Sequence, residues 1–136
     1  MAKILLTGGA GFIGSHLAER LLTSGYRLLV VDDFNDFYSP EIKRRNFSSI
    51  RALGTVDLIE ADICNSDRMT SAFEQFAPEV VIHLAARAGV RPSLEQPLLY
   101  EQTNVRGTLL LLELARKFGA QKFVFASSSS IYGSTS

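Results

Sequence analysis

The sequence has no excess of charge of either sign, since 14 lysine and arginine residues balance 14 aspartate and glutamate residues. Binding to nucleic acid or to an anionic membrane usually depends on clustered positive charge, so we expect neither partner. The single cysteine, Cys64, excludes a disulfide within the chain. No apolar run approaches the ~18–20 residues of a membrane span, and the first residues contain too short an apolar stretch for a signal peptide. These absences together predict a soluble cytoplasmic protein.

What the sequence does contain is an ordinary globular composition, with 136 residues of which 46% are hydrophobic, enough for one domain or part of one. Short apolar runs typical of buried strands alternate with longer stretches typical of helices. We predict strands at 3–7, 27–31, 56–60, 79–83 and 121–126, and helices at 12–23, 40–53, 66–76 and 97–118. This alternation predicts a parallel sheet covered by helices on both faces, in the doubly wound α/β (Rossmann) fold with five strands in the order 3-2-1-4-5. Ligands of such sheets bind at the carboxyl ends of the strands, between strands one and four, where the order reverses.

Five residues are expected to mark the ends of these helices. Ser39 and Ser66 are predicted N-caps, and Pro40 suits a first helical position. Gly25 and Gly119 are predicted to lie just beyond the last turns of helices 12–23 and 97–118.

The turn after the first strand is rich in glycine. Residues 7–14, Thr-Gly-Gly-Ala-Gly-Phe-Ile-Gly, contain both G-x-G-x-x-G and T-G-x-x-G-x-x-G. The first glycine permits a sharp turn, the middle one lets the backbone approach a pyrophosphate, and Gly14 lets the helix pack closely. The helix start then offers free N–H groups to phosphates. The alternative is a glycine-rich turn without a ligand, against which the strand before and the helix after it argue.

Asp32 lies 18 residues beyond Gly14 and directly follows the apolar run 28–31. A carboxylate at this place can accept hydrogen bonds from both hydroxyls of an adenosine ribose, and it repels a 2′-phosphate. The sequence therefore favours NAD over NADP as a ligand. The alternative is that Asp32 and Asp33 merely end a strand.

Further candidate cofactor contacts follow the third and fourth strands. At Asp62-Ile63 the aspartate can bond an adenine amino group while the isoleucine packs on the ring; a polar loop opening is the alternative. Leu84, Ala85 and Ala86 are small and apolar, which lets the backbone approach a cofactor. Asn104 lies within a predicted helix, where asparagine is unfavourable, and is expected to bond neighbouring loop backbone beneath the cofactor.

Three other polar sets leave alternatives open. His83, at the end of the fourth strand, is expected to be a buried histidine satisfied by backbone rather than a catalytic base. Arg87 and Arg91 either reach a phosphate or lie in solvent. The serines at 127–130 either present a hydroxyl near a nicotinamide and its substrate or form a flexible loop.

Together these motifs resemble those of the extended short-chain dehydrogenase/reductases. The matching segments are T-G-G-A-G-F-I-G with its acidic strand end, D-I, H-L-A-A, N-V-x-G-T and S-S-S-x-I-Y-G. Segments 31–38, 85–91 and 125–133 are similar, more narrowly, to the UDP-glucuronate 4-epimerase branch of the sugar-nucleotide epimerases. The resemblance implies bound NAD and a parent reaction in which C4 of a UDP-hexose or UDP-hexuronate is oxidised and then reduced from the other face.

The resemblance also implies roles for single residues, position by position. Ser128 matches the catalytic hydroxyl. Asp32 and Asn35 match adenosine-ribose positions, and Asp62 and Ile63 match adenine positions. The remaining cofactor-binding positions are matched by Gly8, Gly11, Phe12, Ile13 and Gly14 at the pyrophosphate, and by Leu84, Ala85, Ala86 and Asn104 along the cofactor.

The chain departs from that family in one motif, because it contains no Tyr-x-x-x-Lys; the residue four places after Tyr132 is Ser136. In the family this tyrosine takes the 4-hydroxyl proton and the lysine holds the nicotinamide ribose. We therefore expect residues 1–136 to be an incomplete NAD-binding Rossmann domain, without the catalytic helix and the sugar-nucleotide domain. It should bind NAD, hold a UDP-sugar weakly if at all, turn over little, and form a homo-oligomer through the uncovered fifth strand. The alternative is a minimal active epimerase that uses Ser128 or Tyr132 instead.

Overall fold

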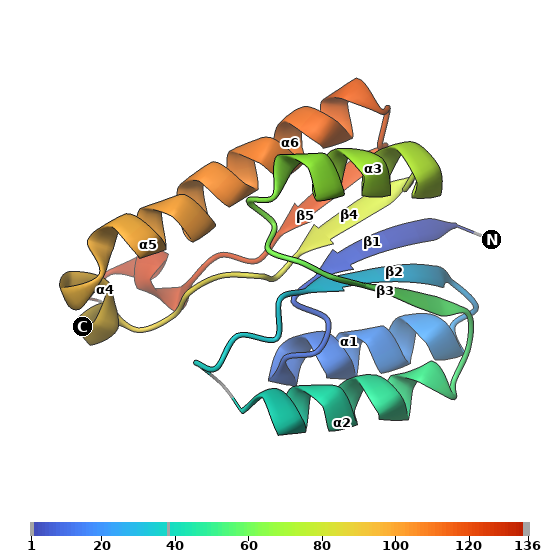
Figure 1. Cartoon of the computed structure of the whole chain (residues 1–136), viewed down its shortest axis with the longest axis horizontal. Helices are drawn as coiled ribbons and strands as arrows, with labels where there is room; N and C mark the ends of the chain where they lie inside the picture. Colours follow the sequence, from blue (N-terminus) through green and yellow to red (C-terminus); the bar gives the residue numbers. More distant parts are fainter. Residues whose placement is uncertain (1, 38, 135–136) are drawn as a thin grey trace.

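A five-stranded sheet forms the centre of the part of the chain that the computed structural model describes, residues 2–37 and 39–134 (Figure 1). All neighbouring strands are parallel, in the order β3-β2-β1-β4-β5. The strands are β1 (Lys3–Thr7), β2 (Arg27–Asp32), β3 (Val56–Glu60), β4 (Val80–His83) and β5 (Lys122–Phe125). The predicted Rossmann fold and strand order are confirmed, and each strand lies at its predicted place in the chain.

Helices cover both faces of the sheet (Figure 1). On one face lie α1 (Phe12–Thr23) and α2 (Pro40–Arg51), and on the other lie α3 (Ser66–Phe76) and α6 (Gly107–Lys117). Successive strand residues point to opposite faces, so each face has its own apolar core. Ile4 and Leu6 pack with Phe47 of α2, whereas Leu5 between them packs with Phe73 of α3. Burial on both faces explains why the strands are continuous apolar runs rather than alternating ones.

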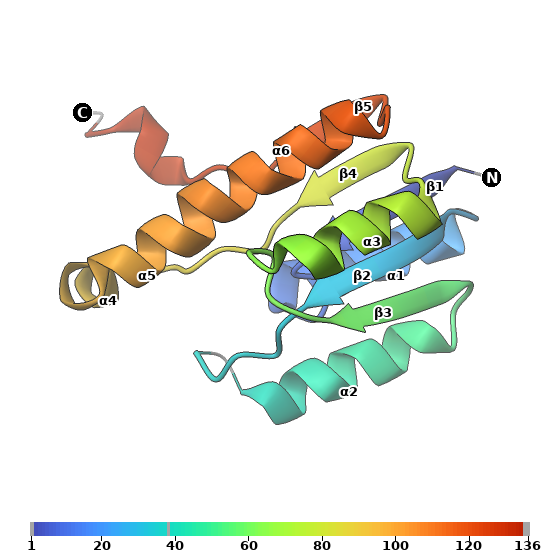
Figure 2. The same ribbon diagram turned by 45° about the horizontal axis from the view of Figure 1, so that its top comes forward.

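The helix predicted over 97–118 is confirmed as one continuous helical segment, Pro97 to Lys117, but its hydrogen-bond register changes within it. A π-helical turn, η1 (Gln102–Arg106), joins α5 (Pro97–Glu101) to α6. Figure 2 shows α5 and α6 as one continuous ribbon, with the short helix α4 (Val90–Glu95) before them. A π turn opens the helical hydrogen-bond ladder locally and is frequent at functional sites. The apolar spacing continues across it, so periodicity could not reveal it. The widened turn carries Asn104.

Two predicted N-caps have different outcomes. Ser39 caps α2 ahead of Pro40, as expected, with its side chain accepting from a backbone N–H of the first turn. At α3 the cap is Asn65 rather than Ser66, because Asn65 Oδ1 accepts from the Arg68 N–H at 3.1 Å. Asparagine and serine cap helices about equally well, so residue type alone could not decide between neighbours.

Glycines end two helices as predicted. Gly25 follows α1 with φ of +90°, and Gly119 follows α6 with φ of +74°. This left-handed conformation is the usual way to leave an α-helix, and glycine adopts it without a Cβ clash.

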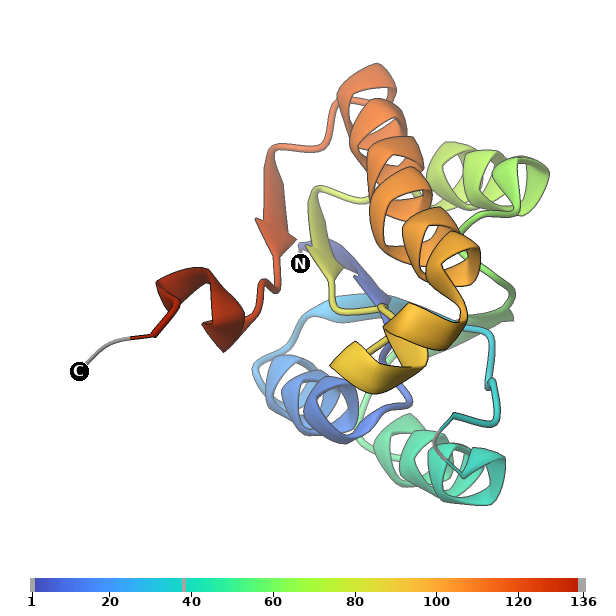
Figure 3. The same ribbon diagram turned by 90° about the vertical axis from the view of Figure 1, so that its left-hand side faces the viewer.

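The segment after β5 leaves the sheet and extends away from the helices (Figure 3). It contains a short 3-10 helix, η2 (Ser129–Tyr132), whose residues are all exposed. β5 therefore forms an edge of the sheet, with Val124 48% and Phe125 54% exposed. Within residues 2–37 and 39–134, no helix has the length and apolar character needed to cross a membrane.

Candidate functional site

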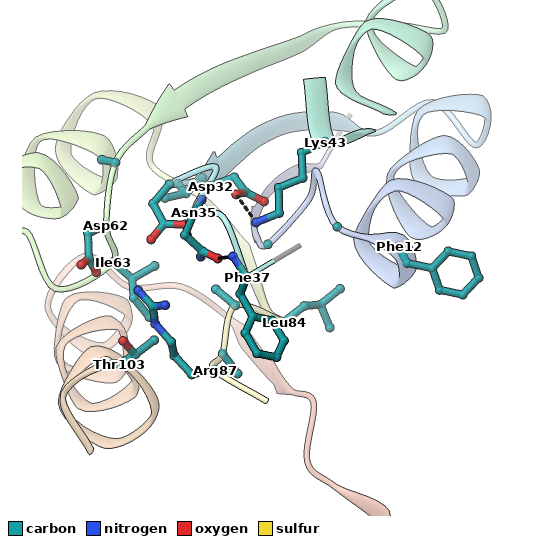
Figure 4. A pocket seen from close by; sticks show the side chains of 17 residues that line it. Phe12, Asp32, Asn35, Phe37, Lys43, Asp62, Ile63, Leu84, Arg87 and Thr103 are labelled. Carbon is teal, nitrogen blue, oxygen red and sulfur yellow. Dashed lines mark hydrogen bonds and ion pairs between the residues drawn. The ribbon is translucent and has the colours of Figure 1, made fainter. Parts of the chain in front are cut away.

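A cavity of about 210 Å³ lies beyond the carboxyl ends of β1, β2 and β4, where the strand order reverses (Figure 4). Doubly wound sheets bind their ligands at this place. The fold brings four loops around one space, and the predicted site residues that line it are Gly8, Gly11, Phe12, Asp32, Asn35, Asp62, Ile63, Leu84, Ala85 and Ala86.

The turn between β1 and α1 forms one wall of the cavity. It is sharp because Gly8 has a φ of +72°, and a Cβ at Gly8 would lie 2.9 Å from the backbone nitrogen of Ala85. Gly14 lies against the Gly8 carbonyl oxygen, with no room for a side chain. α1 begins at its N-cap, Gly11, and among the described residues no side chain caps it and no acid occupies its first turn. Its N-terminal amides and positive dipole end therefore suit an anion.

Asp32, at the end of β2, is 6% exposed and holds the neighbouring backbone. Its Oδ2 accepts from the Ala10 N–H at 3.1 Å, and its Oδ1 accepts from the Phe34 N–H at 2.9 Å. The Lys43 ammonium lies 3.6 Å from Oδ1. A carboxylate has about four lone-pair positions, so it keeps acceptor capacity toward the cavity. Asp32 therefore does hold the end of the strand, and its carboxylate can still accept a hydrogen bond from a ribose hydroxyl.

Lys43 is a candidate site residue that the sequence interpretation missed. Its side chain is 8% exposed, lines the cavity and points at Asp32 (Figure 4). The buried residues of α2 are Lys43, Phe47 and Ile50, which share one helical face. A lysine on an apolar helix face is rarely buried without a partner, and that was the available signal. Because its charge offsets that of Asp32, it weakens the repulsion of a 2′-phosphate inferred from Asp32 alone.

Asn35 and Asp62 line the cavity and also order their own loops. Asn35 Nδ2 donates to Asp33 Oδ1 at 2.7 Å, and Asn35 Oδ1 accepts from the Phe37 N–H at 3.2 Å. Asp62 Oδ1 accepts from the Cys64 N–H at 2.9 Å. Such side chain–backbone bonds replace a regular turn and stiffen the loop. Asp62 therefore both orders the start of its loop and lines the cavity.

Ile63 provides an apolar wall and is 4% exposed. Gly107, at the start of α6, approaches it so closely that a Cβ there would lie 2.5 Å from Ile63 Cδ1. Next in the chain, burial and the adjacent Asp62 carboxylate raise the pKa of the Cys64 thiol to about 11. The thiol is therefore protonated at neutral pH and is a poor nucleophile.

The loop after β4 forms the opposite wall and is fastened at two points. Thr7 Oγ1 accepts from the Leu84 and Ala85 N–H groups, each at 3.0 Å. Asn104 Oδ1 accepts from the Arg87 N–H at 2.8 Å, while its Nδ2 donates to the Arg87 carbonyl at 3.0 Å. The predicted contact of Asn104 with loop backbone is confirmed. Asn104 itself is not a lining residue, but it positions Arg87, which is one.

His83 is 2% exposed and is satisfied by hydroxyl groups, not by backbone as predicted. Thr108 donates its hydroxyl proton to the Asn104 carbonyl at 2.7 Å, so its oxygen accepts from His83 Nε2–H at 2.8 Å. His83 Nδ1 then accepts from the Thr7 hydroxyl at 2.7 Å, because the β1–β4 register pairs the two residues. Burial lowers the pKa of His83 to about 4, which keeps the ring neutral. The prediction of a buried structural histidine is confirmed, with different partners.

Four predicted residues do not line the cavity: Ile13, Gly14, Asn104 and Ser128. Ile13 is 69% exposed on the first turn of α1. Ser128 lies beyond β5 in the exposed segment, where its Oγ accepts from the Ser130 N–H at 3.1 Å. The role predicted for Ser128, near a nicotinamide and its substrate, therefore stays a prediction, since the cavity does not include this segment.

Several lining residues were given no site role from the sequence. Besides Lys43 they are Val31, Asp33, Phe37, Ala61 and Thr103. Most are neighbours in the chain of residues that were predicted, and nothing in their own spacing indicated a contact. Phe37 is 56% exposed and lines the cavity together with Leu84 (Figure 4). Of the two arginines left open, Arg87 lines the cavity and Arg91 is not among the lining residues.

Comparison with known proteins gives concordant matches. The GDP-mannose 4,6 dehydratase family model matches residues 5–136. A UDP-glucuronate 4-epimerase of Thermodesulfobacterium geofontis is 44% identical over 136 residues, covering 100% of this chain and 42% of that protein. A UDP-glucose 4-epimerase of Klebsiella pneumoniae is 40% identical over 133 residues, covering 96% of this chain and 92% of that protein.

Among solved structures, the UDP-glucose-4-epimerase of Stenotrophomonas maltophila with bound NAD and formylated UDP-arabinopyranose matches with a TM-score of 0.86 at 32% identity. The match covers 99% of this chain and 39% of that one. The chain thus spans about two fifths of this structure and of the Thermodesulfobacterium relative. The family match over residues 5–136, on a Rossmann sheet with this glycine turn, shows that the chain belongs to the GDP-mannose 4,6 dehydratase family of the extended short-chain dehydrogenase/reductases, together with the sugar-nucleotide epimerases.

Proposed function

We propose that this chain binds NAD as the cofactor-binding part of a UDP-sugar 4-epimerase. One observation carries the proposal: a single cavity joins the open N-terminus of α1, behind the glycine turn, to the buried carboxylate of Asp32 one strand away. An anion site and a carboxylate that can accept from hydroxyls, both lining one cavity, suit an adenosine diphosphate. The relatives named above include an epimerase crystallised with NAD, which supports the same assignment.

The residues around the cavity fit the successive parts of the cofactor. The backbone from Gly8 to Phe12 would hold the diphosphate, with Arg87 within the same cavity as a cation. Asp32, Lys43 and Asn35 would contact the adenosine ribose. The adenine would lie against Ile63 with Asp62 beside it. When bound, NAD supplies a hydride acceptor for the sugar C4.

We further propose that residues 1–136 form the NAD-binding domain alone and turn over little when assayed by themselves. The sequence contains no Tyr-x-x-x-Lys to move the 4-hydroxyl proton. Ser128, which would assist, is exposed and outside the cavity. General acid–base catalysis typically raises the reaction rate by about 10²–10⁴-fold. Without these groups, the rate with a UDP-sugar should be very low.

Calorimetric titration tests the binding. ADP should bind nearly as tightly as NAD, because the residues for the adenosine half are present and the nicotinamide half lacks its lysine. Asp32→Ala should weaken both ligands by roughly 10- to 100-fold, the range for a lost charge-assisted hydrogen bond. The control is Arg116→Ala, which breaks only an exposed ion pair with Glu113 on α6.

Two results would contradict this binding proposal. A wild-type chain that binds neither nucleotide refutes the function outright. A large advantage of NAD over ADP shows that a nicotinamide site exists, and then the domain assignment is wrong.

A coupled assay tests turnover with UDP-glucuronate and with UDP-glucose, with and without added NAD. We expect no rate above the protein-free control. A measurable rate that Ser128→Ala abolishes would instead favour the minimal active epimerase, with Ser128 acting directly.

We also propose that the chain self-associates through β5. This strand is an edge of the sheet, and Val124 and Phe125 are about half exposed on it. An apolar edge strand is a template for pairing with a second copy. Light scattering should give a mass above 14.9 kDa at high concentration, and Val124→Lys should reduce it; a concentration-independent monomer refutes the proposal.

A further inference from the structure

Asn46 reaches the glycine turn from a helix that is remote in the sequence. It lies half-buried on α2, and its Nδ2 donates to the Ala10 carbonyl at 3.0 Å. Ala10 is fully buried and lies between Gly9 and Gly11 in the turn. Asparagine at this position was given no role by the sequence motifs, because 36 residues separate it from Ala10.

The bond from Asn46 completes the restraint of one peptide group. The Ala10–Gly11 peptide has its oxygen held by Asn46 and its N–H donated to the Gly8 carbonyl at 3.1 Å. On its other side, the Ala10 N–H donates to Asp32 Oδ2 at 3.1 Å. Both polar groups of Ala10 are therefore held by side chains from outside the turn.

This restraint matters because of the glycines. Gly9 and Gly11 flank Ala10, and glycine lacks the Cβ that would otherwise limit backbone rotation. Gly11 is also the N-cap of α1, so the orientation of its peptide sets where the first helical amides point. Gly11 and Phe12, where the helix begins, line the cavity that we assign to the diphosphate.

We propose that Asn46 is a positioning residue for diphosphate binding: it locks the Ala10–Gly11 peptide so that the α1 amides are preorganised for the anion. The inference rests on the proposed nucleotide-binding function and adds to it a residue outside the motif. Preorganised donors bind an anion without first paying the cost of ordering.

Calorimetry with two probes, ADP and adenosine, separates this role from a general structural one. Asn46→Leu keeps the size of the side chain and removes the donor, and Asn46→Asp keeps the shape and places an acceptor against the carbonyl. Both should weaken ADP by about 2- to 13-fold, the range for one hydrogen bond, while adenosine affinity stays unchanged. Ser49→Ala is the matched control, since Ser49 lies one turn further along α2 and, among the residues that the structure describes, its hydroxyl bonds only the Arg45 carbonyl.

Hydrogen exchange gives a readout without ligand. The Gly11 amide should exchange faster in Asn46→Leu, while the Gly25 amide, bonded to the Leu22 carbonyl at 3.0 Å, should not change. If Asn46→Leu shows no cooperative unfolding transition, Asn46→Ser replaces it.

The outcomes are distinct. Equal loss of ADP and adenosine affinity overturns the inference, because Asn46 would then only support the fold. If the wild-type chain binds ADP and the Asn46 variants bind it equally well, the inference is overturned and the proposed function stands. A wild-type chain that binds no ADP overturns the proposed function together with it.

Discussion

Acid should destabilise this fold through one buried histidine. Burial lowers the pKa of His83 to about 4, whereas the ordinary value is 6.5. Between these values the unfolded chain binds a proton that the folded chain does not, so the free energy of unfolding falls as the pH falls. The contribution is fully present above pH 6.5 and is lost progressively toward pH 4. The full difference corresponds to about 3 kcal/mol, of which about 2 kcal/mol is already lost at pH 5.

Urea unfolding at pH 8 and pH 5 measures this loss. Carboxylates also titrate over this range, so the informative quantity is the difference between the wild type and His83→Gln, which does not titrate. The stability of the wild type should fall by about 2 kcal/mol more than that of the variant.

The reasoning is refuted if the wild type and His83→Gln lose equal stability between the two pH values. Such a result would mean that the folded protein accepts a proton on His83 at no cost. A proton accepted without cost is inconsistent with a buried ring whose two nitrogens are both bonded to threonine hydroxyls.

Three further predictions follow from individual contacts. Gly14→Ala should cost about 1–3 kcal/mol in urea unfolding and weaken ADP, because its Cβ would meet the Gly8 carbonyl; unchanged values would show that the turn can relax. Lys43→Met should cost about 3 kcal/mol by leaving Asp32 buried without its cation. The same variant should widen the preference for NAD over NADP in calorimetry, and an unchanged ratio contradicts the role assigned to Lys43. Arg116→Ala should leave the urea midpoint at its wild-type value, since its pair with Glu113 is exposed; a clear fall in the midpoint contradicts this.

Local signals predicted the parts of the fold that short segments determine. Continuous apolar runs indicated strands buried on both faces, and these form the sheet in the predicted order. Gly25 and Gly119 indicated helix ends because glycine adopts a left-handed φ without the cost that other residues incur. Both glycines have this φ in the structure. The glycine turn and Asp32 were recognisable because their spacing along the chain reflects one strand–turn–helix unit.

Other features were not predictable because they depend on packing between distant elements. The π turn at η1 lies where Asn104 meets the backbone of Arg87, and the apolar spacing of the segment gives no sign of it. The partners of His83 come from β1 and α6, which the parallel register and helix packing bring to it.

By itself, the sequence determined the alternating elements, the strand order that right-handed crossovers allow, and the glycine turn with its acidic strand end, because periodicity and backbone conformation are properties of a few consecutive residues. Only the tertiary structure decided that Lys43 neutralises Asp32, that Asn46 holds Ala10, and that Ser128 lies away from the cavity. These relations join residues that are far apart in the chain, and side-chain charge and hydrogen bonding act over a few ångströms of space, whatever the distance along the sequence.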